Sequence, residues 1–154
     1  MKRAGQRGLT LVELVVAFTI MLTLSAMAIP MVRVKVRTRK ELDLKYALRQ
    51  MRNGIDKYKD ACDQGLFGAV KQGTLCYPES LEMLVEGVKL QSAEGKKMYF
   101  LRSIPFDPFT RSNEWGLRSM QDDPKSQNWG GQNIFDVYSK TTDRAPDGQP
   151  YSEW

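Results

Sequence analysis

The amino-acid sequence predicts an α+β protein, in which one long N-terminal helix packs on a small C-terminal head with a short antiparallel sheet. Three observations support this fold class. Residues Leu9–Val32 form an apolar run whose only charge is Glu13. Apolar residues then recur in steps of four and three up to Cys62, which is the spacing of one helix face. After Lys97 the chain changes to short β-prone runs separated by Pro, Gly, Asn and Asp.

The apolar run is long enough to cross a bilayer. Its 24 residues would extend roughly 36 Å as a helix. A carboxylate inside a membrane helix costs about 2.5 to 3.5 kcal/mol on insertion scales, so Glu13 is expected to have a partner or a function. Pro30 lies inside the same run, where it removes one backbone hydrogen bond and predicts a kink or a loosened turn.

The residues before this run allow two processing events. Met1–Gly8 carries three basic residues and no acid. One reading is a secretory signal peptide with its apolar core at Leu14–Leu24 and cleavage after Ala28, which would discard the run. The other reading is a short leader that is cut after Gly8, which makes Leu9 the amino terminus and keeps the run. The second reading accounts for Gly8 and Glu13, neither of which a signal peptide needs.

These residues resemble a known pattern. Arg7-Gly8-Leu9-Thr10-Leu11-Val12-Glu13-Leu14, followed by about twenty apolar residues with Pro30 near their end, resembles the class III leader and N-terminal helix of type IV pilins and type II secretion pseudopilins. The resemblance implies that a prepilin peptidase cuts between Gly8 and Leu9 and methylates the amino group of Leu9. It implies that Glu13 helps to assemble a filament by meeting the amino terminus of a neighbouring subunit. The family usually has Phe where this chain has Leu9, and it tolerates leucine there.

Together the patterns and the resemblance divide the chain into four parts. These are a leader (1–8), a transmembrane and polymerisation helix (9–32), an amphipathic continuation of that helix (33–63) and a periplasmic globular head (64–154). In the continuation, the apolar stripe consists of Leu44, Leu48, Met51, Ile55, Tyr58 and Cys62. Basic residues flank both ends of the apolar run, so charge alone does not set its orientation. The resemblance implies a single-pass inner-membrane protein with the head in the periplasm.

The head is expected to begin with a loop at Asp63–Thr74. A short second helix should follow, with Pro78 near its first turn, leucines on its inner side and Gly87 as its C-cap. Met98–Leu101 and Ile134–Tyr138 are the β-prone runs, and a small antiparallel sheet is the simplest arrangement for them.

Two segments of the head narrow the resemblance within the family. Ile104-Pro105-Phe106-Asp107-Pro108-Phe109 and Phe135-Asp136-Val137-Tyr138-Ser139 resemble segments of the major, G-type, pseudopilins of type II secretion. Those proteins commonly bind calcium in the loop that follows. In this chain Asp143, Asp147 and Ser139 could supply oxygen ligands to calcium. The loop is shorter than in the family and contains Arg144, so a plain turn at Asp147-Gly148 remains an equal reading.

Cys62 and Cys76 are the two cysteines of the chain. Outside the cytoplasm they could form a disulfide around a glycine-containing loop, worth about 3 kcal/mol in the chain-entropy model. Cys62 also continues the apolar stripe, where a buried free thiol would be ordinary. With no histidine in the chain, the two cysteines do not make a convincing zinc site.

Composition argues against an enzyme and against specific nucleic-acid binding. The absence of histidine removes the usual general base and the Ser-His and Cys-His pairs, and no phosphate-binding glycine motif is present. Asp122-Asp123 lies beside Pro124 in a polar stretch that reads as a loop. The net charge is +5, but the leader supplies three of these charges, and the mature chain would carry 20 basic and 18 acidic side chains. Much of the remaining basic charge follows the apolar run, where water or anionic lipid can meet it.

The sequence therefore predicts a structural subunit that polymerises into a periplasmic pseudopilus serving type II secretion. Its expected partners are identical subunits, minor pseudopilins, the prepilin peptidase, the inner-membrane assembly platform and, before assembly, membrane lipid. Calcium is the one cofactor left open. Two alternatives remain: a type IV or competence pilin that forms a surface fibre for adhesion or DNA uptake, and a periplasmic binding module released by signal peptidase.

Overall fold

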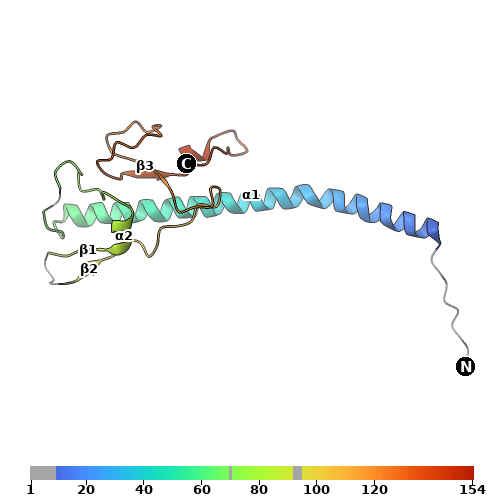
Figure 1. Ribbon diagram of the computed structural model, residues 1–154, viewed down its shortest axis with the longest axis horizontal. Helices are drawn as coiled ribbons and strands as arrows, with labels where there is room; N and C mark the ends of the chain where they lie inside the picture. Colours follow the sequence, from blue (N-terminus) through green and yellow to red (C-terminus); the bar gives the residue numbers. More distant parts are fainter. Residues whose placement is uncertain (1–9, 70, 92–94) are drawn as a thin grey trace, which may run out of the picture. The chain divides into compact units, whose positions relative to one another are not determined.

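A computed structural model describes residues 10–69, 71–91 and 95–154, with the side chains of 27–31 outside the description. It divides into two compact units, Met1–Arg39 and Lys40–Trp154. The predicted α+β class is confirmed, because a long N-terminal helix is combined with a small C-terminal head that carries short antiparallel sheets. The elements are α1 (Leu11–Asp63), α2 (Glu82–Glu86), β1 (Val88–Lys89), β2 (Lys97–Met98), β3 (Gly116–Arg118), β4 (Asp136–Tyr138) and the 3-10 helix η1 (Tyr151–Glu153) (Figure 1).

The core of the C-terminal unit is built on one face of α1. All six residues of the predicted stripe are buried, with at most 5% of any of them exposed. Leu84 of α2, Val137 of β4 and Tyr151 of η1 belong to the same core. Burial of a large apolar side chain contributes about 1.5 to 3 kcal/mol, so this single helix face accounts for much of the stability of the unit.

The two sheets are smaller than predicted and pair differently. The runs Met98–Leu101 and Ile134–Tyr138 do not pair with each other. Instead β1 pairs with β2, with Val88 opposite Met98, and β3 pairs with β4, with Gly116 opposite Tyr138; both pairs are antiparallel. Figure 1 shows the β1–β2 hairpin and β3 on different sides of the C-terminal half of α1. The two predicted runs are thus kept apart, and each takes a short partner strand that was not predicted.

The short helix α2 is held by its packing against α1. Leu84 is completely buried, and Gly87 ends the helix with φ of 77° while its N–H donates to the carbonyl of Met83 at 3.1 Å. Gly87 is therefore the C-cap, as predicted. The N–H of Leu101 donates to the carbonyl of Leu84 at 2.9 Å, and a Cβ added at Gly54 of α1 would lie 3.0 Å from the Leu101 side chain. The glycine allows α1 and the α2 region to approach closely.

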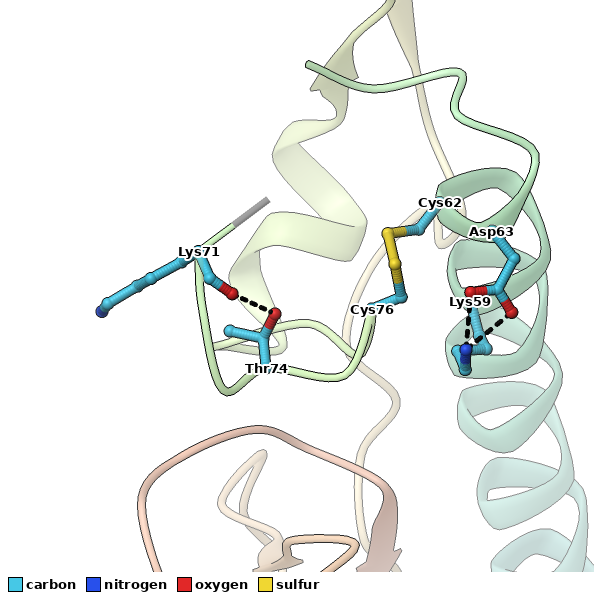
Figure 2. Close-up of a disulfide and its surroundings, with 6 residues drawn as sticks. All are labelled: Lys59, Cys62, Asp63, Lys71, Thr74 and Cys76. Atoms are coloured by element: carbon cyan, nitrogen blue, oxygen red, sulfur yellow. Dashed lines mark hydrogen bonds and ion pairs between the residues drawn. A yellow bond between two sulfur atoms is a disulfide. The ribbon is translucent and has the colours of Figure 1, made fainter. Parts of the chain in front are cut away.

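A disulfide joins the last turn of α1 to the loop that follows it (Figure 2). The Cα atoms of Cys62 and Cys76 lie 5.6 Å apart. Within the last turns of α1, the Lys59 ammonium and the Asp63 carboxylate form an ion pair at 2.6 Å. In the loop, the hydroxyl of Thr74 donates to the carbonyl of Lys71 at 2.9 Å. Of the two readings that the sequence allows for these cysteines, the structure contains the bridge.

Asp136 of β4 lies between two arginines from different elements. Nε of Arg52, on α1, donates to Oδ1 of Asp136 at 2.7 Å, and Nη1 of Arg118, on β3, donates to Oδ2 at 3.4 Å. Arg118 is only 8% exposed. The two guanidinium groups also donate to the main-chain carbonyls of Ser126, Val137, Ser152 and Trp154. This cluster ties α1, both strands of one sheet and the η1 segment together.

Within the described residues, no helix combines the length and the apolarity that crossing a membrane requires. Part of the predicted span Leu9–Val32 is not described by the structure. Leu9 lies outside the described residues, and so do the side chains of residues 27–31. The helix assignment of α1 continues through Pro30. A kink at this proline therefore stays a prediction.

Replacing Asp136 by Ala should lower the free energy of unfolding by about 2 to 3 kcal/mol, because the buried guanidinium of Arg118 and the half-buried one of Arg52 lose their charged acceptor. Urea unfolding of the full chain in detergent, followed by tryptophan fluorescence, measures this loss. Glu79→Ala is the matched control, since it removes the carboxylate of an exposed pair with Lys71 and should cost less than about 1 kcal/mol. Equal losses in the two variants would contradict the role given to Asp136.

The Cys62–Cys76 bridge should stabilise the folded chain by about 3 kcal/mol, because it restricts the unfolded loop. The double variant Cys62→Ser, Cys76→Ser should therefore unfold at lower urea concentration than the oxidised wild type. Added reductant should bring the wild type to the stability of the double variant and should leave the double variant unchanged. A wild type that is insensitive to reductant at every urea concentration would speak against the bridge.

Candidate functional site

The predicted processing and assembly residues lie at the start of α1. Gly8 and Leu9, predicted to flank the cleavage point, lie outside the described residues. Glu13 is in the first turn of α1, and its side chain is exposed. The partial positive charge at a helix N-terminus favours a carboxylate there by about 0.3 to 1 kcal/mol. The position of Glu13 therefore stabilises the helix in addition to any role between chains.

Thr10 precedes α1 and caps it. Its Oγ1 accepts a hydrogen bond from the N–H of Glu13 at 3.3 Å, and its carbonyl accepts one from the N–H of Leu14 at 3.2 Å. A Thr followed three positions later by Glu is the sequence of a capping box. This capping role was not predicted, although the spacing of Thr10 and Glu13 is the signal that could have found it.

Beyond Glu13 the first unit presents apolar side chains on all sides of the helix. Every side chain from Leu11 to Ala26 is exposed. The threonines of this stretch bond back to the helix: the hydroxyl of Thr19 donates to the carbonyl of Val16, and that of Thr23 to the carbonyl of Ile20, each at 2.8 Å. These bonds satisfy the hydroxyls locally. The surface is therefore suited to contact with lipid tails or with other apolar helices.

The three residues predicted as calcium ligands have separate surroundings. The hydroxyl of Ser139 is buried and donates to Oδ2 of Asp107 at 2.6 Å. Oδ1 of Asp147 accepts a hydrogen bond from the N–H of Gln149 at 3.0 Å, in a turn completed by Gly148. Asp143 is exposed. In the part of the chain that the structure describes, no group of three or more His, Cys, Asp or Glu side chains could hold a metal ion. Asp147 and Gly148 form a turn, and a calcium site at these residues stays a prediction.

A hollow of about 550 Å³ opens beside this C-terminal loop. Its ionisable lining consists of Lys140, Arg144 and Glu153, together with Tyr138. Nη1 of Arg144 donates to the carbonyl of Gly148 at 3.1 Å and so holds the turn from within the loop. Two cations against one carboxylate make this lining unfavourable for a divalent cation, which needs several oxygen ligands of negative charge.

Asp107 is a buried acid that connects the segments Ile104–Phe109 and Phe135–Ser139. It is completely buried, and its carboxylate accepts hydrogen bonds from the N–H groups of Phe109 and Thr110 at 2.8 and 3.3 Å and from the Ser139 hydroxyl. Three donors satisfy this carboxylate without a cation. This hydrogen bond was not predicted, because Asp107 and Ser139 are 32 positions apart and no local sequence pattern connects them.

Two described titratable groups have clear pKa shifts, and both are explained by the fold. Backbone N–H groups of Ser119 and Gly130 donate to Asp122 at 2.7 and 3.1 Å, and these hydrogen bonds lower the pKa of its carboxyl. Burial raises the pKa of Tyr58, and the charge of Glu79 adds to the effect. Asp122 therefore orders its own loop, as the polar stretch beside Pro124 suggested, and Tyr58 belongs to the core.

Comparison with known proteins identifies the N-terminal segment. Residues 3–29 match the family described as the prokaryotic N-terminal methylation motif, and the matched range contains Gly8, Leu9, Thr10 and Glu13. Comparisons with curated proteins and with solved structures gave no match. The methylation motif indicates a type IV pilin-like prepilin. Such prepilins form a structural and generally non-enzymatic family. A prepilin peptidase processes its members, which then polymerise.

Proposed function

We propose that this chain is a structural subunit of a periplasmic pseudopilus that drives type II protein secretion. A prepilin peptidase cuts between Gly8 and Leu9 and methylates Leu9. The mature subunit then waits in the inner membrane as a single-pass protein, with its C-terminal unit in the periplasm. The inner-membrane assembly platform adds such subunits at the base of a fibre that minor pseudopilins also enter. Growth of the fibre moves secreted proteins outward.

The observation that carries this proposal is a carboxylate in the first turn of a helix whose apolar side chains from Leu11 to Ala26 are exposed. In lipid, Glu13 would cost about 2.5 to 3.5 kcal/mol. Cleavage before Leu9 creates an amino group of opposite charge at the end of each neighbouring helix. Pairing between chains offsets the cost only when both charges are well placed, which favours a defined register between subunits. Assembly would thus replace lipid by identical helices and neutralise Glu13 at the same time.

The C-terminal unit supports the secretion branch of the family rather than a surface pilus. The segments Ile104–Phe109 and Phe135–Ser139, which resemble those of major pseudopilins, are joined through the buried Asp107–Ser139 hydrogen bond. A surface pilin would favour a longer C-terminal region closed by a disulfide. Here the bridge closes the loop after α1 instead, between Cys62 and Cys76.

Cleavage after Gly8 should give a mature chain that begins with N-methylated Leu9. Mass spectrometry of the N-terminal peptide, after expression with a prepilin peptidase, measures this directly. Replacing Gly8 by Val should leave the precursor uncut, because the bulky side chain would hinder the peptidase. A mature chain that starts at Ile29 would instead establish a signal peptide and end the proposal.

The two roles of Glu13 can be separated by two substitutions. Glu13→Gln keeps a residue that suits a capping box but removes the charge, whereas Glu13→Ala removes both. If pairing between chains is the function, both variants should insert into the membrane normally and should fail to form sedimentable filaments. Thr10→Ala is the matched control: it weakens the cap by about 1 kcal/mol and leaves the charge in place, so it should still assemble. Filaments formed normally by Glu13→Gln would defeat the charge-pairing mechanism.

The same variants test the secretion role when they are expressed in cells from which the gene has been deleted. The deletion cells should retain in the periplasm the enzymes that the parent cells release. Expression of the wild-type chain should restore release, whereas expression of Glu13→Gln should not. Normal secretion together with the loss of a surface fibre would favour the pilin alternative.

A further inference from the structure

One face of α1 in the C-terminal unit is largely exposed. Leu42, Lys45, Tyr46 and Arg49 follow the spacing of neighbours on one side of a helix, opposite the buried stripe. We call these four residues the outer stripe. Leu42 is 63% exposed and Tyr46 is 71% exposed, and neither packs against the core. Two large apolar side chains are thus combined with two cations on an open helix face.

The two cations of the outer stripe line an open hollow of about 370 Å³ together with Asp147, Gln149 and Trp154, so an external partner can reach them. The Lys45 ammonium lies 4.3 Å from the centre of the Trp154 ring, which holds it in place without neutralising its charge. The Arg49 side chain is exposed, and it has no ion pair or hydrogen bond among the described residues. A carboxylate from outside the unit could therefore meet both side chains.

A groove of complementary character lies at α2. It has a volume of about 310 Å³ and is lined by Glu82, Val85, Glu86, Ser103, Ile104 and Asn113. Val85 and Ile104 form an apolar floor that is continuous with the core. Glu82 and Glu86 are exposed on its rim, and neither carboxylate has an ion-pair partner in the described part of the chain. Such a groove fits apolar side chains that are accompanied by cations.

We propose that the outer stripe of one copy of this chain docks into the α2 groove of a second copy. Tyr46 and Leu42 would cover Val85 and Ile104, while Lys45 and Arg49 would face Glu82 and Glu86. The two surfaces share no residue, so each copy can use both at once. A contact between two different surfaces does not close on itself and continues into a fibre or a ring. This inference rests on the proposed polymerisation and names the contact between its C-terminal units.

The geometry of one unit also gives the offset between copies. The α2 region lies beside Gly54, through Leu101, whereas the outer stripe is centred near Tyr46. These positions are separated by about 12 Å along α1, from a rise of about 1.5 Å per residue. If the helices of successive copies run parallel, each copy is displaced along the helix axis by about that distance.

Charge reversal tests the contact in the full chain, processed and assembled as above. Arg49→Glu, and separately Glu82→Lys with Glu86→Lys, should each reduce sedimentable filaments by about tenfold or more, because like charges would then face each other. The combined variant, with Lys45→Glu added so that both cations of the outer stripe are reversed, should recover to within about threefold of the wild type, since the charges are complementary again. Lys125→Glu is the matched control: it reverses an exposed charge outside both surfaces, and its filament yield should be unchanged.

The outcomes separate this contact from the proposed function. A wild type that forms no filaments under any condition would count against polymerisation itself. A wild type that assembles, with Arg49→Glu assembling equally well, would overturn the contact alone. A photo-crosslinker, p-benzoylphenylalanine in place of Tyr46, gives a second measurement. In filaments it should join two copies through peptides that contain Glu82–Glu86 or Ser103–Asn113, and joining to any other segment would also overturn the contact.

Discussion

The structure of the C-terminal unit depends on one apolar face of α1. Its sheets have two strands each, and two-stranded sheets of two or three residues are not stable alone in water. The stripe from Leu44 to Cys62 supplies the surface on which both sheets, α2 and η1 are arranged. The ion-pair cluster around Asp136 and the Cys62–Cys76 bridge then secure elements that the stripe has already brought together. A helix whose described side chains are exposed in one unit thus carries the core of the other.

The first unit is governed by a different constraint. Its side chains from Leu11 to Ala26 have no core to enter, and its polar groups satisfy themselves within the helix through Thr10, Thr19 and Thr23. Glu13 takes part in the cap through its N–H, while its carboxylate remains exposed. The same residue can therefore start the helix and offer a charge to another chain. The methylation motif fits this division, because the processing chemistry acts on the segment that the core does not use.

The sequence predicted the features that repeat along the chain and missed those that depend on distant partners. The stripe on α1 was found because six apolar residues share one helical period, and Gly87 was found because a glycine after a short apolar helix is a common end signal. The strands β1 and β3 were missed, since two or three residues are too few to show alternation. The Asp107–Ser139 bond and the Asp136 cluster were missed because no local pattern joins their partners. The calcium ligands were predicted by resemblance to a family whose loop is longer. In this chain the Ser139 hydroxyl donates to Asp107, Asp147 accepts a hydrogen bond within a turn, and Asp143 is exposed.

The burial of Tyr151 has a consequence for the order in which the chain is made. The Tyr151 side chain is completely buried, and its ring centre lies 4.3 Å from that of Phe109, with the two rings tilted. Its hydroxyl donates to Oε1 of Glu41 at 2.6 Å, and the two residues are 110 positions apart in the sequence. The core that α1 begins is therefore closed by a residue that is synthesised 110 positions after Glu41. A chain interrupted during translation or export would carry the stripe of α1 without its cover. Such a fragment would present apolar surface to proteases and chaperones, and only finished subunits would have a sealed core when they meet one another.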